Sequence, residues 1–511
     1  MKIQINQLGY TADMKKVALL RDELAEELQV FNQAGALVMT LPVDVKRTEI
    51  WGDLVAEVDF SALQEPGMYT LRCGAESSWP FPVGERPYQA CLTALVDMFY
   101  YQRCGDDLDE RAGVFAHPAC HTGLARVYGT EEWREVNGGW HDAGDFGRYI
   151  VPAAKAAADL LLAWQWNPAA FEKPGLTPVL EETRYELEWM LKMQREDGGV
   201  YHKVSCARFC GMIMPHEEQE ELIISPVSTT ATGDFAACMA MASRYYAKID
   251  TTFADRMLAA AKRAWDFLAV TEPILFRNPE GISTGGYGDR DDADERLWAH
   301  VELALTCGEE KYLTAAREAI LRSDRCHAPL GWGDMRGYAA VEGLGLPGEL
   351  GEICRRWVLE AADDLLTRIN VYGITMTERL PWGSNMNISN DGMLFHQAWL
   401  LTGAEKYREA AWKQLHYLLG VNPVDTCYVS GFGTRPMARP HHRPSVALGV
   451  CQPGMLSGGA CSGLADACAR EHLQGQPAGK CFIDMHESYS TNEICVYWNS
   501  PMVALLAGLT K

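Results

Sequence analysis

Carboxylates stand in two segments that are otherwise built from glycine, aromatic and small polar residues. The segment GGWHDAGDFGRY at 138–149 carries Asp142 and Asp145, three residues apart, and YSTNEICVYWN at 489–499 carries Glu493 ahead of an apolar run. Carboxyl groups in such surroundings can exchange protons with a bound substrate as general acid and general base. Each group taken alone also fits a helix cap, a first-turn carboxylate or a solvated side chain.

A third polar loop adds groups that could bind hydroxyls. The sequence GFGTRP at 431–436 is followed by PHHR at 440–443, in which His441 and Arg443 could hold a substrate or could form a hydrogen-bonded surface turn. Aromatic rings can stack on the apolar faces of sugars, and the chain is rich in them, with 15 Trp and 20 Tyr. Trp332, Trp382 and Tyr287 fit such stacking as well as they fit core packing.

Two thiols and two imidazoles of the kind that bind zinc occur between residues 104 and 141. They are Cys104, Cys120, His121 and His141. Their spacing matches no standard zinc finger, so coincidence is the alternative. Most other cysteines, Cys326 among them, are expected to be reduced, small core residues, because 16 Cys in 511 residues is far below the density of a disulfide scaffold.

Two kinds of element must position these groups, and they divide the chain at residue 85. Residues 1–85 contain short alternating runs between turn glycines, which predicts an all-β sandwich. Residues 86–511 carry apolar residues at helical spacing, and about 425 residues exceed what one core usually supports, so we expect a closed ring of helix pairs. The predicted helices are 88–103, 150–166, 180–195, 230–247, 252–270, 293–307, 310–323, 349–369, 393–403, 405–419 and 494–509.

Composition excludes several classes of protein. The balance of 48% hydrophobic and 22% charged residues is that of a globular chain. The net charge of −22 argues against nucleic acid or an anionic membrane as a partner, and no apolar run is long enough to span a bilayer. The first residues show no secretory leader, so we expect a cytoplasmic protein, or a secreted one if a leader has been removed.

Several motifs together resemble glycoside hydrolase family 9, which contains the cellulases. The opening INQLGY and KKVALL, with the later VDFSAL and PGMYTL, resemble the immunoglobulin-like domain of one branch of that family. The resemblance covers nearly the whole chain, with the motifs in family order. The motifs in the remainder are GGWHDAGDFGRY, WGSN at 382–385, LGVNP, YVSGFG, PHHR and YSTNE.

The resemblance implies a multi-domain fold and a mechanism. An immunoglobulin-like β-sandwich (1–85) would precede an (α/α)6-barrel catalytic domain (86–511). Asp145 would be the general base and Glu493 the general acid of an inverting β-1,4-glucanase, with Asp142 positioning the attacking water. Burial near apolar and anionic groups would keep Glu493 protonated. His441 and Arg443 match family positions that contact the sugar at the point of cleavage. Independently of the resemblance, we expect the substrate to lie against the aromatic residues Tyr489, Trp332, Trp382 and Tyr287.

The resemblance also implies metals. The two cysteines and two histidines match the zinc-binding positions of the branch, and four protein ligands would make a structural zinc site that holds the loop of Asp142. Calcium is a weaker expectation, on Asp234 and the acidic run at 288–295, where a solvated capping turn is an equal alternative.

Three other functions stay open at this stage. An exo-acting β-glucosidase or glucosaminidase on short imported oligosaccharides would suit a chain without a leader. A carbohydrate-binding protein without catalysis would not need all three carboxylates. A metallohydrolase would need an open position on the zinc. In each carbohydrate hypothesis the partner is a β-glucan or oligosaccharide, and we expect a monomer.

Overall fold

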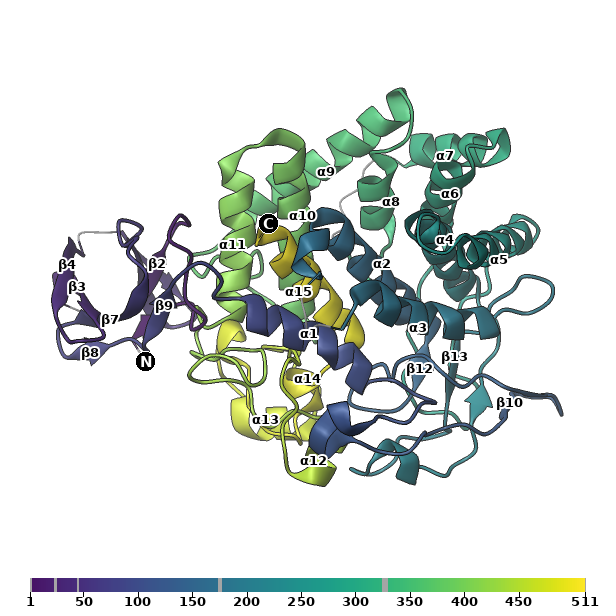
Figure 1. Ribbon diagram of the computed structural model, residues 1–511, viewed down its shortest axis with the longest axis horizontal. Coiled ribbons are helices and arrows are strands. Elements are labelled where there is room, and N and C mark those ends of the chain that lie inside the picture. The colour runs from purple at the N-terminus through teal and green to yellow at the C-terminus, as the bar shows by residue number, and fades with distance from the viewer. Residues whose placement is uncertain (1, 23–24, 44–45, 173–176, 324–329, 511) are drawn as a thin grey trace.

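The computed structural model describes residues 2–22, 25–43, 46–172, 177–323 and 330–510. Cys326 lies outside these ranges, and the described cysteines are all free. Figure 1 shows a small β domain attached to one side of a large helical domain. Among the described residues, no helix is both long and apolar enough to cross a membrane.

The β domain is a sandwich of two antiparallel sheets, in the orders β1-β2-β6-β5 and β4-β3-β7-β8, with β9 also paired to β7. Alternation explains the strands: in β7, Tyr69, Leu71 and Cys73 point inward, while Met68 and Arg72 are exposed. The strands are β1 Ile3–Gln4, β2 Val17–Arg21, β3 Glu27–Asn32, β4 Leu37–Pro42, β5 Arg47–Ile50, β6 Asp53–Asp59, β7 Gly67–Cys73, β8 Glu76–Ser77 and β9 Phe81–Val83.

The remaining chain forms a ring of paired helices. The inner helices are α2 (Ile150–Trp166), α4 (Thr229–Tyr246), α6 (Ala293–Cys307), α8 (Arg336–Gly343), α10 (Ser384–Thr402) and α15 (Val496–Leu509). The outer ones are α1 (Gln89–Tyr101), α3 (Val179–Lys192), α5 (Thr251–Ala269), α7 (Glu310–Arg322), α9 (Glu349–Arg368) and α11 (Glu405–Leu418). Each outer helix packs on an inner one, so the predicted (α/α)6 barrel is confirmed.

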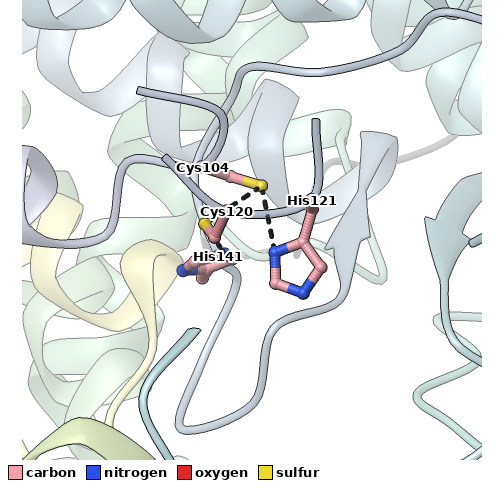
Figure 2. A group of neighbouring side chains, drawn as sticks. All are labelled: Cys104, Cys120, His121 and His141. Carbon is pink, nitrogen blue, oxygen red and sulfur yellow. Dashed lines mark hydrogen bonds between the residues drawn. The ribbon is translucent and has the colours of Figure 1, made fainter. Parts of the chain in front are cut away.

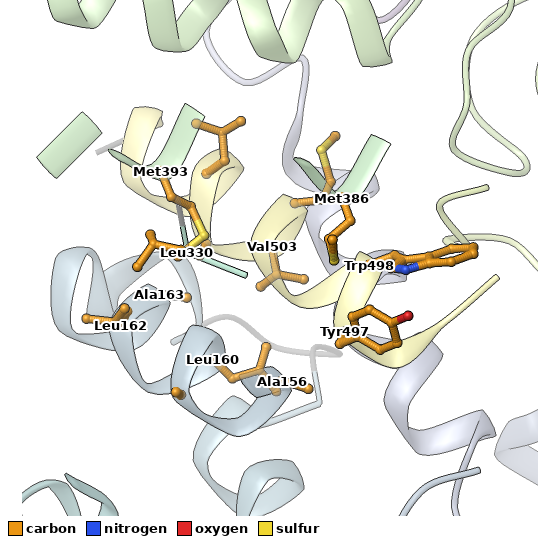
Figure 3. Close-up of a cluster of buried hydrophobic side chains, with 14 of the residues drawn as sticks. Ala156, Leu160, Leu162, Ala163, Leu330, Met386, Met393, Tyr497, Trp498 and Val503 are labelled. Atoms are coloured by element: carbon orange, nitrogen blue, oxygen red, sulfur yellow. The ribbon is translucent and has the colours of Figure 1, made fainter. Parts of the chain in front are cut away.

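Burial separates the two rings. Every described residue of α15 is buried, and so are nearly all of α2 and α4, whereas α5, α7 and α9 bury one face. Figure 3 shows where three inner helices meet, with Leu160 of α2, Met393 of α10 and Val503 of α15 in one apolar cluster. The inner ring is therefore the core on which the connecting loops are mounted.

Two helices differ from the prediction. The helix expected at 393–403 begins at Ser384, and α8 was not predicted. The first turns of α10 are polar yet buried because Ser384 Oγ donates to Ala460 O (2.7 Å) and Asn385 Nδ2 donates to Ser457 O (2.9 Å). Hydrophobic periodicity cannot detect a helix whose buried face is hydrogen-bonded to loops.

The loops at one end of the barrel contain short elements that the sequence did not predict. Five short strands form a sheet in the order β11-β10-β14-β13-β12. They are β10 Ala125–Val127, β11 Trp133–Arg134, β12 Arg148–Tyr149, β13 Lys203–Ser205 and β14 Ile223–Ile224. Short helices α12 (Arg443–Leu448), α13 (Ala467–Leu473) and α14 (Tyr489–Asn492) complete this end.

Candidate active site

A cavity of about 610 Å³ opens among these loops and is lined by every residue that the sequence singled out for catalysis or substrate binding. A ligand pocket of this size lined by aromatic side chains and a few convergent polar groups is typical of a small-molecule or sugar site. The predicted residues that line it are Asp142, Asp145, Glu493, His441, Arg443, Tyr489, Trp332, Trp382 and Tyr287.

The loop of residues 142–147, called the base loop after the role that the family resemblance implies for Asp145, folds back on itself instead of capping a helix. Asp142 N donates to Gly147 O (2.9 Å), and Gly147 N donates to the Asp145 carboxylate (3.0 Å). The residue before α2 is Tyr149, so neither aspartate serves as its cap. Both side chains are nearly buried and line the cavity.

Glu493 lies in an extended linker between α14 and α15. It is therefore not a first-turn carboxylate of the last helix, the alternative that the sequence left open, because α15 begins at Val496. This linker pairs directly with the base loop: Ala143 forms a bridge with Cys495, and Val496 N donates to Asp142 O (2.8 Å). On its other side Gly458 N donates to Glu493 O (2.8 Å). The backbone thus holds the segment of Glu493 against the segment of Asp142 and Asp145, although some 350 residues of chain separate them.

The third loop joins the same assembly. His441 N donates to Asn492 O (2.9 Å), next to Glu493. Position 144 can accommodate only glycine, because a Cβ atom at Gly144 would lie 2.0 Å from His441 O. This contact explains why glycine stands between the two aspartates.

Burial controls the charge of the three carboxyls. Burial, and then the negative charges of Asp145 and Asp142, raise the pKa of Glu493 well above its usual value. Burial, and then the negative charge of Asp145, also raise the pKa of Asp142 well above its usual value. The pKa of Asp145 is also raised by burial, but Arg443 and the Gly147 N–H oppose the shift. This environment favours a protonated Glu493, whereas Arg443 and the Gly147 N–H favour the ionised form of Asp145 against the effect of burial.

Two tyrosines each contact one aspartate. Tyr287 Oη donates to Asp142 Oδ2 (2.5 Å), and Tyr149 Oη lies 3.4 Å from Asp145 Oδ2. Sequence reasoning missed Tyr149, although it belongs to the same motif as both aspartates. It also missed Phe209 and Tyr497, which line the cavity together with Trp498, a residue that the sequence offered only as an apolar neighbour of Glu493. Trp498 and Tyr497 adjoin Glu493 in sequence, which was an available signal, whereas nothing in the sequence singled out Phe209.

Arg443 has a structural task in addition to its place in the cavity. Its Nη1 donates to Gly144 O (2.7 Å), and its Nη2 donates to Cys210 O (3.2 Å). The guanidinium therefore fastens the base loop to the segment that carries Phe209. His441 is held through Nδ1, 2.6 Å from His486 O, which leaves its other nitrogen for the cavity.

The aromatic side chains differ in exposure. Trp382 is 46% exposed and Tyr489 is 37% exposed, and their ring centroids lie 5.3 Å apart. Trp332 packs edge-on against Tyr287 at 5.1 Å. Trp382 and Tyr489 thus present an open aromatic surface at the cavity, while Tyr287 is committed to Asp142.

The four predicted zinc ligands converge at one point (Figure 2), where their ligand atoms all lie within 4.8 Å of one another. Cys104 Sγ is 3.6 Å from His121 Nδ1, and Cys120 Sγ is 3.6 Å from His141 Nε2. Zinc–ligand bonds of about 2.0–2.3 Å in a tetrahedron place ligand atoms roughly 3.3–3.8 Å apart, so the set fits this ion.

The surroundings of the cluster resemble the outer shell of a metal site. Glu218 lies 3.0 Å from His121 Nε2, the nitrogen that faces away from the cluster. Gln102 Nε2 donates both to His141 O (3.0 Å) and to Ala143 O (2.8 Å). The cluster is therefore connected to the base loop through the backbone.

The acidic residues proposed for calcium separate into two groups. Asp291 caps the Ala293 N–H and Asp292 pairs with Arg296 (2.9 Å), as in the capping alternative. Asp234 is buried with no hydrogen bond to either carboxylate oxygen. Burial, followed by the neighbouring charges of Asp294 and Asp289, raises the pKa of Asp234. A cation or retained protons would satisfy this group.

Comparison with known proteins places these features in a family context. A family model described as "Glycosyl hydrolase family 9" matches residues 88–506, and one described as "Cellulase N-terminal ig-like domain" matches residues 1–78. A cellodextrinase from Butyrivibrio fibrisolvens is 34% identical, with 100% of each chain covered.

Solved structures agree over the full length. A single mutant of a thermostable endoglucanase from Alicyclobacillus acidocaldarius superposes with a TM-score of 0.94 and 37% identity, covering 100% of this chain and 99% of that one. AaCel9A in complex with cellobiose-like isofagomine has a TM-score of 0.93, 37% identity and 100% coverage of both chains.

Proposed function

The chain belongs to glycosyl hydrolase family 9 and is a glycosidase, and we propose that it hydrolyses β-1,4-linked glucan chains with inversion at the anomeric carbon. The family and the immunoglobulin-like branch inferred from the motifs are confirmed. The observation that carries the proposal is the meeting of Asp145 and Glu493, on separate backbone segments, at one aromatic-lined cavity.

Each carboxyl has a distinct task in this reaction. Glu493, kept protonated by burial and by the nearby aspartates, gives its proton to the leaving glycosidic oxygen. Asp145, ionised beside Arg443, takes a proton from a water that attacks the opposite face of the sugar. Asp142, oriented by Tyr287, positions that water. Such chemistry needs about 6.5–9.5 Å between acid and base.

The stereochemistry of the first product tests this mechanism. Hydrolysis of a soluble β-1,4-glucan oligosaccharide, followed by proton NMR before mutarotation, is expected to give the α-anomer first. A β-anomer would contradict inversion, because two displacements would then have occurred at the anomeric carbon.

A second candidate is exo-acting hydrolysis of short oligosaccharides. It is favoured by the full-length similarity to a cellodextrinase. Product profiles on cellohexaose and on chitosan oligomers separate the candidates: an endo-acting glucanase releases mixed cello-oligosaccharides at the first time point. Monomer alone from the beginning would favour the exo-acting enzyme, and cleavage only of chitosan would indicate a glucosaminidase.

We also propose that Cys104, Cys120, His121 and His141 hold a structural zinc ion. The fit of the donor set and the outer contact with Glu218 support this assignment. Four protein ligands leave no open position, so zinc would stabilise the base loop without taking part in the chemistry. Calcium at Asp234 rests on the unpartnered buried carboxylate alone, and metal analysis of the purified protein tests both ions.

A further inference from the structure

A buried lysine and a buried tyrosine lie close to Asp145. Tyr149 and Lys203 occupy opposed positions of β12 and β13, with Lys203 Nζ 5.4 Å from the centre of the Tyr149 ring. Lys203 is fully buried and Tyr149 is 2% exposed. Nothing in the mechanism above uses Lys203, although an uncompensated buried ammonium is costly.

Hydrogen bonds fix the direction of the tyrosine proton. Gly285 N donates to Tyr149 Oη (3.1 Å), so this oxygen is already an acceptor. Its own proton is then available to Asp145 Oδ2, 3.4 Å away. The space for this hydroxyl is built in, because a Cβ on Gly147 would lie 2.4 Å from Tyr149 Oη.

Lys203 holds the segment that positions the tyrosine. Its Nζ donates to Gly285 O (2.5 Å), Thr284 Oγ1 (2.9 Å) and Asn278 Oδ1 (2.7 Å). Three acceptors use all three protons of an ammonium group, so the geometry selects the charged form. The same residue thus fixes the Gly285 turn and places a positive charge behind Asp145.

We propose that Tyr149 and Lys203 form a positioning pair that orients the Asp145 carboxylate and keeps it ionised for its task as general base. The inference rests on the proposed function, since it assigns Asp145 the role of base. Tyr149 acts through one hydrogen bond to Asp145, and Lys203 acts through Gly285 and through its charge.

The charges around Asp145 show why a second cation matters. Burial and the negative charge of Glu218 disfavour its ionised form. Arg443 favours it, but the guanidinium also holds two backbone carbonyls. Burial lowers the pKa of Lys203 to about 7, and the attraction of Asp145 opposes that shift. Lys203 is therefore a second cation that interacts electrostatically with Asp145.

Single and double substitutions test the pair. In Tyr149→Phe and Lys203→Met, the acidic limb of the kcat/KM profile on cellotetraose is expected to move upward by roughly half to one pH unit. We expect kcat to fall about tenfold with KM within about twofold, because orientation and protonation of a base affect turnover more than binding. In the double variant, kcat should fall by less than the product of the two single fold-decreases, because both residues act through Asp145.

Controls separate positioning from folding. Tyr128→Phe removes a hydroxyl that donates to Glu280 O (3.1 Å), near the same segment but away from Asp145, and should leave the profile unchanged. If thermal unfolding shows that Lys203→Met does not fold, the pH profile of the near-isosteric Tyr149→Phe variant alone tests the proposal. An unmoved acidic limb in Tyr149→Phe, or an equal shift in Tyr128→Phe, would overturn the pair.

A binding measurement distinguishes failure of this inference from failure of the proposed function. Isofagomine is a cationic sugar mimic, so its affinity at low pH reports ionisation of the cavity carboxylates without turnover. Titration calorimetry should show the acidic loss of affinity moved upward in both variants. Wild-type protein that hydrolyses no β-1,4-glucan would refute the proposed function, whereas unshifted binding in the variants would refute the pair.

Discussion

Replacing Glu493 with Gln removes the acid while preserving the size of the side chain. General acid catalysis is worth about 10²–10⁴-fold, which corresponds to about 3–5 kcal/mol of barrier at roughly 1.4 kcal/mol per factor of ten. We expect a loss of this size in kcat on cellotetraose. On 2,4-dinitrophenyl β-cellobioside the loss should be small, because that leaving group departs without a proton.

The pH dependence of this variant follows from the raised pKa of Glu493. In the wild type the alkaline limb of kcat/KM reports loss of the Glu493 proton, so it lies well above the pH at which an ordinary glutamate ionises. The variant has no such proton to lose, and its alkaline limb should disappear. An unchanged limb, or unchanged turnover of cellotetraose, would refute the assignment of Glu493 as the acid.

Stability gives an independent measure of the same raised pKa. The folded protein binds this proton more tightly than the unfolded chain does, so Glu493 costs no stability below its ordinary pKa of 4.5 and costs progressively more as the pH rises toward its folded value. A tenfold difference in proton affinity between the folded and unfolded states corresponds to about 1.4 kcal/mol. Glu493→Gln should therefore raise the Tm at pH 7 but not at pH 4. Glu487→Gln, on an exposed side chain of the same segment, is the matched control and should raise the Tm at neither pH.

Three further predictions concern the metal, the base loop and the aromatic surface. Removal of zinc at neutral pH should lower the Tm, but the protein that stays folded should keep its glycosidase activity. Complete loss of activity in folded, zinc-free protein would favour a catalytic metal. Arg443→Lys should lower kcat by about 10–100-fold without unfolding the chain, because an ammonium group cannot replace the guanidinium that donates to two backbone carbonyls. An unchanged kcat would contradict the role of Arg443 in holding the base loop. Trp382→Ala should raise KM for cellohexaose by about tenfold with little change in Tm, and an unchanged KM would remove Trp382 from the substrate surface.

Helical periodicity predicted most of the barrel because its helices bury apolar faces. The bounds of α2 and α6 agree with the prediction at both ends. The polar start of α10 and the short helix α8 were not predicted because their positions depend on contacts with residues distant in sequence. Ser384 is buried against Ala460, a partner that only the folded loops provide.

The site was predictable in its residue types but not in its supports. Asp142, Asp145 and Glu493 stand in motifs whose glycines and aromatic residues mark them. Lys203 stands in the segment YHKVS, in which no motif marks it as functional. Only the pairing of β12 with β13 places it opposite Tyr149. Strands of two or three residues leave no periodic pattern, so this sheet and the contact it creates could not be inferred from the sequence.

The segments that carry Asp145 and Glu493 meet through main-chain contacts, and this has a consequence for every substitution in the site. The bridge from Ala143 to Cys495 and the bond from Val496 N to Asp142 O do not depend on which side chain stands at 493 or 145. Conservative replacement of either carboxyl therefore alters proton transfer while leaving the segments in place. Gly144 is different, because any side chain there meets His441 O and must push the base loop away from the loop that borders the acid.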